Sequence, residues 1–173
     1  MYLITAYFDR NTSGHLSNLM ENMSAVCKND FMVVNEIPPH MTLLQFHSNA
    51  EQTKIIELFR GVEIDHENIL SFPGYGTMIP KIACLAVEKT EVLLNLVSRF
   101  HEKMKNLPET IFNSHYVPSN FFPHVSIAKH LTDEQRNKAM LYLAEQKNPP
   151  AGRIAAISLT VGKPPHELFR LEC

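Results

Sequence analysis

Two short motifs, each a histidine followed two residues later by a hydroxyl side chain, are the groups in this chain best suited to chemistry. One pairs His40 with Thr42, the other pairs His124 with Ser126, and a proline precedes each histidine. In a β-strand, residues i and i+2 point to the same face, roughly 6.5–7 Å apart. Each motif is therefore expected to present an imidazole and a hydroxyl side by side, with the intervening residue in the core.

These residue types suit the opening of a phosphodiester. An imidazole titrates near pH 6.5, so one histidine can be neutral and act as base while the other is protonated and acts as acid. The hydroxyls of Thr42 and Ser126 can donate hydrogen bonds to the non-bridging phosphate oxygens, where charge builds up in the transition state. The motifs predict acid/base catalysis that needs no metal, and they leave open which histidine is the base.

Neither a metal site nor a disulfide framework is indicated. A zinc site needs three or four converging ligands, whereas the two histidines have no acidic or cysteine motif nearby. The cysteines, Cys27, Cys84 and Cys173, are odd in number, widely spaced and form no Cys-x-x-Cys pair. We expect reduced thiols, no metal and no cofactor.

The charge pattern bears on the kind of partner. The net charge is −2 with histidines neutral, and the basic residues are dispersed. Proteins that grip long nucleic acid usually carry a basic stripe, which this sequence lacks. A substrate of this chain is therefore expected to be a small nucleotide or an RNA terminus.

Location and assembly follow from weaker signals. No apolar run approaches the roughly 20 residues that a membrane helix needs, and the apolar stretch at residues 2–8 has no basic segment before it. We expect a cytoplasmic protein without membrane contact, and a monomer by default.

Periodicity and turn residues predict an alternation of strands and helices. Residues 73–76 are expected to form a turn and residues 106–122 a long connection. Strands are expected at 2–8, 41–46, 62–72, 79–87, 125–129, 154–161 and 168–172, and helices at 15–28, 50–59, 90–104 and 132–146, the first capped by Thr12 or Ser13 and the last by Thr132 or Asp133.

The order strand-helix-strand-helix-strand occurs twice, and the best local match between the copies is Pro-His-Met-Thr-Leu at 39–43 against Pro-His-Val-Ser-Ile at 123–127. This pattern indicates an internal duplication within one domain spanning residues 1–173. The expected architecture is α+β and bilobal, with approximate lobes 1–76 and 77–173 that can exchange strands. The two motifs would face each other across a pseudo-twofold axis.

At residues 39–43 and 122–129 the chain resembles the two-histidine (2H) phosphoesterase superfamily, in the branch named for bacterial 2′-5′ RNA ligase. The resemblance implies a bilobal, pseudo-symmetric fold in which antiparallel sheets form a central cleft. It implies a phosphodiesterase acting on 2′,3′-cyclic phosphates or 2′-5′ bonds of RNA or nucleotides. His40 and His124 would be acid and base, with Thr42 and Ser126 on the phosphate.

Three further residues are weaker candidates for substrate binding. Lys129 occupies a position where many relatives carry arginine, although strict alternation predicts that it leaves the face of His124. Tyr116, in the long connection, and Phe122, just ahead of the second motif, could stack on a base or merely pin the loop to the core.

Two other classes of function use the same four residues. A non-catalytic module could bind a nucleotide or an RNA end in this pocket without turnover, and a scaffold with vestigial motifs would bind no phosphate. The sequence does not separate these alternatives from the hydrolase.

Overall fold

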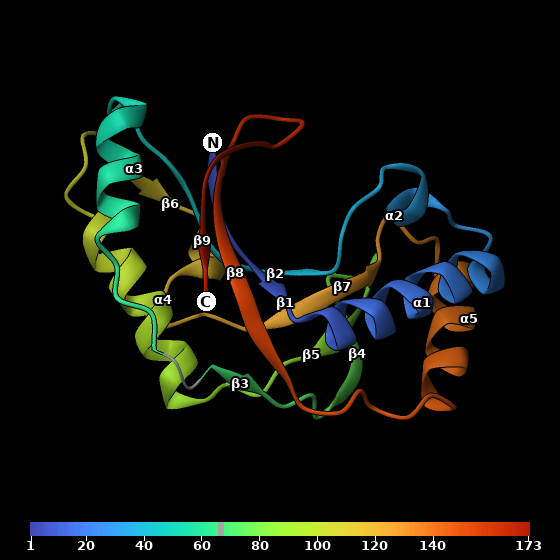
Figure 1. Ribbon diagram of the computed structural model, residues 1–173. Coiled ribbons are helices and arrows are strands. Elements are labelled where there is room, and N and C mark those ends of the chain that lie inside the picture. The colour runs from blue at the N-terminus through green and yellow to red at the C-terminus, as the bar shows by residue number, and fades with distance from the viewer. Residues whose placement is uncertain (66–67) are drawn as a thin grey trace.

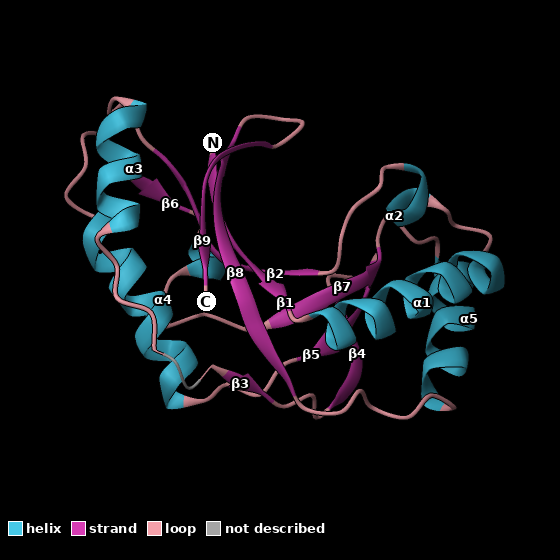
Figure 2. Ribbon diagram, viewed as in Figure 1, coloured by secondary structure: helices cyan, strands magenta, loops and turns pink. Residues whose placement is uncertain are grey.

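The computed structural model describes residues 1–65 and 68–173 and shows an α+β protein with two antiparallel sheets (Figure 1, Figure 2). The elements are β1 (Tyr2–Phe8), α1 (Arg10–Cys27), α2 (Phe31–Val34), β2 (His40–His47), α3 (Gln52–Arg60), β3 (Ile69–Leu70), β4 (Gly74–Met78), β5 (Ile82–Ala86), α4 (Glu91–Met104), β6 (Ile111–Phe112), a 3₁₀ turn (Ser114–Tyr116), β7 (His124–Ala128), α5 (Asp133–Ala144), β8 (Gly152–Val161) and β9 (His166–Glu172).

The larger sheet has six strands in the order β3-β8-β1-β2-β6, with β9 also paired to β8. All of its pairings are antiparallel. The helices α3 and α4 pack against it, and the stacked rings of Phe59 and Phe100, with centroids 5.4 Å apart, join them in the core. This lobe lies on the left in Figure 1.

The smaller sheet has three strands in the order β4-β5-β7. The helix α1 contacts both β7 and α5, and α5 contacts β4 and β5, so these two helices complete the second lobe. The helix α1 precedes residue 76 in the chain, whereas β8 and β9 of the larger sheet follow it. Each lobe therefore combines segments from both halves of the chain, and the expected boundary near residue 76 does not separate them.

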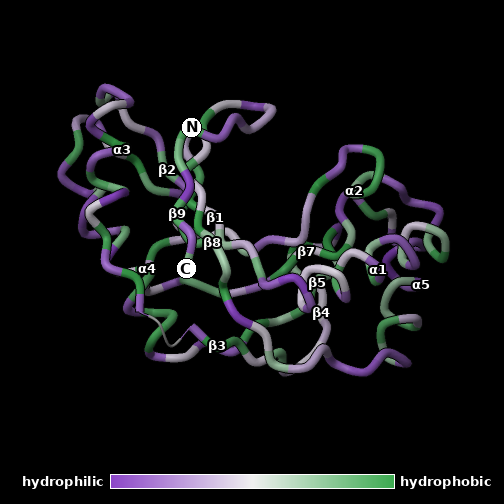
Figure 3. The backbone as a smooth tube through the Cα atoms, in the orientation of Figure 1, coloured by the Kyte–Doolittle hydropathy of each residue, from purple (hydrophilic) through white to green (hydrophobic). Residues whose placement is uncertain are grey.

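Hydrophobic residues are concentrated in the central strands, and hydrophilic residues in the peripheral helices and loops (Figure 3). The buried apolar side chains form one cluster that reaches from Ile4 of β1 to Leu143 of α5. A continuous core of this kind resists relative motion of the two lobes, because interiors are close-packed. Among the described residues, none of the helices is long and apolar enough to cross a membrane.

Several elements differ from the expectations. Residues 74–78 form the strand β4 rather than a turn, because Gly74–Met78 pairs along β5, and the chain reverses at residues 79–81 instead. The expected strand at 62–72 is reduced to Ile69–Leu70, and its residues 66–67 lie outside the described part. The connection at 106–122 contains β6 and the 3₁₀ turn.

The first helix starts earlier than expected, because its cap is Asp9 rather than Thr12 or Ser13. The Asp9 carboxylate accepts from the backbone N–H of Thr12 at 3.0 Å, which adds residues 10–14 to the helix. In the last helix the expected cap Thr132 is observed, and Gln135 completes a capping box.

Candidate active site

The two motifs lie on strands of different sheets that meet at the centre of the molecule. His40 is the first residue of β2 and His124 the first residue of β7. Residues of these two strands come within 8 Å of each other at their Cα atoms (Figure 1). The charge of His124 is close enough to His40 to affect its pKa. The structure thus brings the two histidines into one site.

Both imidazoles are held in the same way. The Nδ1 atom of His40 lies 2.8 Å from the carbonyl oxygen of Pro38, and Nδ1 of His124 lies 2.9 Å from that of Phe122. A carbonyl can only accept, so Nδ1 carries the proton and donates in both rings. This leaves Nε2 of each ring to exchange a proton with a substrate. The repeated i to i−2 contact is a local consequence of the duplicated motif.

The surroundings favour the neutral form of both rings. Burial lowers the pKa of His40, and the charges of Lys129 and His124 lower it further, against the hydrogen bond to Pro38. Burial also lowers the pKa of His124, the hydrogen bond to Phe122 raises it, and Lys129 lowers it. A bound phosphate would supply the negative charge that restores the protonated form of one ring.

The two hydroxyls lie on the same strands as the imidazoles. Thr42 follows His40 in β2 and is half-buried, whereas Ser126 in β7 is only 7% exposed. Burial raises the pKa of the Tyr116 phenol, and the Thr42 side chain beside it lowers that pKa in part. Tyr116 therefore contacts Thr42, one of the four motif residues.

The charge of Lys129 acts on both rings, although strict alternation predicts that this residue leaves their face. The strand β7 ends at Ala128, and His130 has a positive φ of 58°, so the period of two stops before Lys129. The charge of Lys129 lowers the pKa of both His40 and His124, and burial lowers the pKa of Lys129 itself. The site therefore includes a cation whose charge acts on both imidazoles.

Phe122 stands at the edge of this site. Its side chain is 54% exposed, and its ring lies 6.3 Å from that of His124 at an interplanar angle of 25°. An exposed aromatic ring beside an imidazole offers a surface on which a base can stack.

A sequence profile of the 2′-5′ RNA ligase superfamily matches residues 15–163, most of the chain. The chain belongs to this superfamily. Among solved structures, the chain is similar to that of E. coli LigT complexed with 3′-AMP, with a TM-score of 0.58 and 11% identity over 99% of this chain and 95% of LigT. Comparison with curated protein sequences gives no match.

The fold of this 2′-5′ RNA ligase superfamily member is that of the 2H phosphoesterases, as expected from the two motifs. The superfamily and the LigT-like fold support an activity of the phosphoesterase or 2′-5′ RNA ligase type. No three His, Cys, Asp or Glu side chains of residues 1–65 and 68–173 converge as metal ligands would.

Sequence reasoning about this superfamily member missed Tyr7. It pairs with His40 across β1 and β2, and the two ring centroids are 6.5 Å apart. The signal was present in residues 2–8, where Leu3, Thr5 and Tyr7 alternate with more deeply buried residues. Alternation can indicate the face of residues 2–8 but not the neighbouring strand, because strand pairing is a long-range property.

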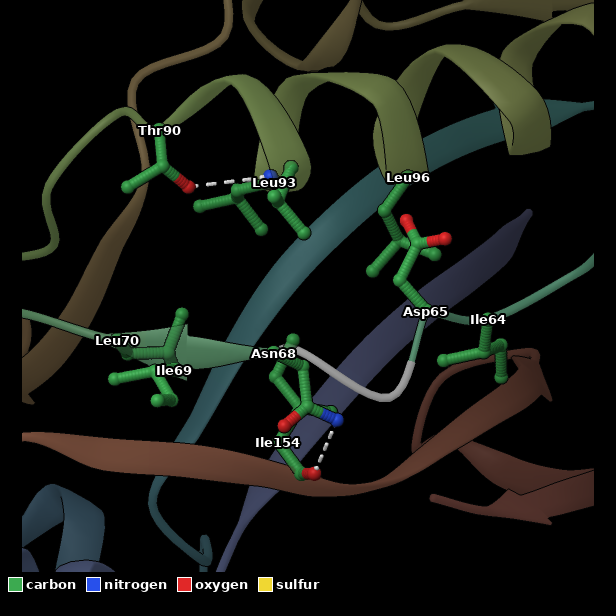
Figure 4. A pocket seen from close by; sticks show the side chains of 10 residues that line it. Ile64, Asp65, Asn68, Ile69, Leu70, Thr90, Leu93, Leu96 and Ile154 are labelled. Atoms are coloured by element: carbon green, nitrogen blue, oxygen red, sulfur yellow. Dashed lines mark hydrogen bonds between the residues drawn. The ribbon is translucent and has the colours of Figure 1, made fainter.

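A cavity under α4 belongs to the core rather than to the site (Figure 4). Its volume is about 10 Å³, at the lower limit for one water molecule. Its polar side chains already have partners: Asn68 donates to the carbonyl of Ile154 at 2.9 Å, Thr90 caps α4 by accepting from the Leu93 N–H, and Asp65 pairs with Arg99. This cavity offers no room for a nucleotide.

Proposed function

We propose that this protein is a metal-independent phosphodiesterase that acts on 2′,3′-cyclic phosphates or 2′-5′ phosphodiester bonds of small nucleotides or RNA ends. The observation that carries the proposal is the matched pair of imidazoles, each with Nδ1 bonded to a backbone carbonyl and Nε2 available to a substrate. Two such rings can complete both proton transfers of a hydrolysis.

Hydrolysis of a 2′,3′-cyclic phosphate would use one histidine as base and the other as acid. A water oxygen attacks phosphorus, and its proton passes to Nε2 of the neutral histidine. The bond from phosphorus to one ribose oxygen breaks, and the protonated histidine gives its proton to that oxygen. The products are a nucleoside monophosphate and an enzyme with the two protonation states exchanged, which solvent resets.

The remaining motif residues and Lys129 would stabilise the phosphate. Thr42 and Ser126 each lie two residues after a histidine in the same strand. Their hydroxyls can donate to the non-bridging oxygens of the phosphate. Lys129 offers a positive charge that the phosphodiester anion would compensate, whereas burial alone lowers its pKa in the free protein. We propose that Phe122 borders the substrate site, and that Tyr116 borders it by its contact with Thr42.

The proposal predicts that His40→Ala and His124→Ala each lower kcat by about 10²–10⁴-fold, the scale for loss of a catalytic acid or base. The assay follows conversion of adenosine 2′,3′-cyclic phosphate to the monophosphate by chromatography, with EDTA present. The control is His47→Ala, at the exposed far end of the same strand, which should retain wild-type kcat.

A double variant that keeps the wild-type rate would refute the catalytic role of the two histidines. Complete loss of activity in EDTA, restored by zinc, would favour metal catalysis instead. Wild-type protein that binds the cyclic nucleotide and forms no product would identify a binding module.

A further inference from the structure

A groove beside His40 has no role in the proton transfers above. Its volume is about 350 Å³, and Leu3, Thr5 and Tyr7 of β1 contribute to its lining. Tyr7 pairs with His40, and Thr5 pairs with Thr42. Partners in an antiparallel ladder share a face of the sheet, so the groove continues directly from the first motif.

The sides of the groove come from two loops. The segment 35–38, between α2 and β2, contributes Ile37 and Pro38, and the turn between β8 and β9 contributes Pro164 and Pro165. Ligand pockets commonly measure about 300–1,000 Å³, and this groove lies at the small end of that range. Apolar surfaces around a space of this size suit one base and its sugar rather than a nucleotide chain.

The charged side chains that line the groove, apart from His40, are two carboxylates, Glu36 and Glu167. Among the described residues, neither a lysine nor an arginine lines it. Arg170 is nearby, with its guanidinium 5.1 Å from the centroid of the Tyr7 ring. The Arg170 guanidinium already pairs with two carboxylates: its Nε lies 2.7 Å from Oε1 of Glu172, and its Nη1 lies 3.9 Å from Oε2 of Glu167.

The site is therefore electrically asymmetric. Lys129 acts on both imidazoles, where the reacting phosphate is proposed to lie, whereas Glu36 and Glu167 line the adjoining groove. A second phosphate of a substrate bound in this groove would face these carboxylates, and like charges repel.

Polar atoms in the groove suit an uncharged polar ligand. The Ser158 hydroxyl donates a hydrogen bond to the Glu167 carboxylate. Burial raises the pKa of the Tyr7 phenol, and the charge of Glu167 raises it further. Hydroxyls of a sugar can pair with the exposed side chains of Asn35 and Glu36, which line the same groove, without adding charge.

We propose that this groove is the subsite for the substrate's nucleoside, and that its carboxylates select nucleosides with a free 5′-hydroxyl over those that carry a 5′-phosphate. This inference rests on the proposed function for the position of the reacting phosphate, and it narrows the substrate class. It favours mononucleotide 2′,3′-cyclic phosphates over RNA ends, in which the last nucleoside carries a charged 5′-phosphodiester.

Binding measurements test the subsite without requiring turnover. Adenosine 3′-monophosphate and adenosine 3′,5′-bisphosphate are titrated into the wild-type protein by calorimetry at low ionic strength. We expect a Kd about tenfold larger for the bisphosphate, with the difference shrinking as salt screens the carboxylates. In Glu36→Lys the ratio of the two Kd values should fall by about fivefold, because repulsion is replaced by attraction.

The matched control is Glu145→Lys, which makes the same change in net charge at the end of α5, in the other lobe. It should keep the wild-type ratio. Glu36 is exposed in a loop, so its replacement leaves the core intact. Glu167→Gln removes the second carboxylate with little change in shape and should also lower the ratio.

The outcomes separate this inference from the proposed function. Equal Kd values for the two nucleotides in wild type would overturn the subsite while leaving the hydrolase intact. A tenfold ratio that persists in both Glu36→Lys and Glu167→Gln would also overturn it. A ratio that behaves as expected in a protein without turnover would support the groove and refute the hydrolase.

Discussion

Gly152, at the start of β8, is predicted to be a position that alanine cannot occupy without cost. A Cβ atom there would lie 2.3 Å from Oγ1 and 3.0 Å from Cγ2 of Thr12. Thr12 cannot easily withdraw, because its N–H and Oγ1 donate to Asp9 at 3.0 and 2.8 Å. Asp9 in turn accepts from the N–H of Arg153 at 2.9 Å. This cluster joins α1 of one lobe to β8 of the other.

The cost of Gly152→Ala follows from these contacts. Overpacking a filled site costs about 1–3 kcal/mol, and loss of the Thr12 bond to the Asp9 carboxylate adds about 1.5 kcal/mol. The lower entropy of the unfolded chain with alanine returns about 0.5 kcal/mol. The net loss is about 2–4 kcal/mol, which for a chain of this size lowers Tm by roughly 5–12 °C.

Urea and thermal unfolding measure this loss, with Gly76→Ala in β4 as the control. A Cβ on Gly76 meets no atom of the described residues within 4 Å, so its variant should change stability by less than about 0.5 kcal/mol. Thr12→Ala removes Oγ1 and Cγ2. Adding Gly152→Ala to that variant should lower its free energy of unfolding by less than about 1 kcal/mol. Equal stability of the Gly152 and Gly76 variants would show that Thr12 does not restrict the side chain at position 152.

Two predictions concern pH. Lys129→Met removes a charge that lowers the pKa of both His40 and His124, so the bell-shaped profile of kcat/KM should move to higher pH, and an unchanged profile would contradict the proximity of Lys129. Both histidines have a folded-state pKa below 6.5, so the unfolded chain binds protons more readily, and the free energy of unfolding should fall as the pH drops from 6.5 through the folded-state values. Replacing both by glutamine should flatten that slope in urea titrations, and an equally steep slope would show that other groups cause it.

The local parts of the fold were predictable because they depend on nearby residues. Apolar spacing predicted a helix at 90–104, and the structure has α4 at Glu91–Met104 with Thr90 as its N-cap. The turn predicted at 73–76 was wrong. Gly74 and Gly76 favour turns locally, but pairing with β5 holds them in an extended strand.

The same division applies to the site. Thr42 could be placed beside His40 from the sequence, because both lie in one strand with a period of two. The position of Lys129 could not, because it depends on where β7 ends and on the left-handed backbone at His130. The contact of Tyr116 with Thr42 depends on a loop whose path no periodicity describes.

Two pairs of an imidazole and a hydroxyl could be predicted from the sequence, because strand geometry assembles each pair within three consecutive residues. The folded chain adds three features: β2 meets β7, the charge of Lys129 acts on both rings, and Tyr7, Glu36 and Glu167 line a groove next to His40. These features are not predictable locally, because alternation along a strand is a local steric property. Which strands become neighbours is settled by burial of the whole core, to which residues throughout the chain contribute.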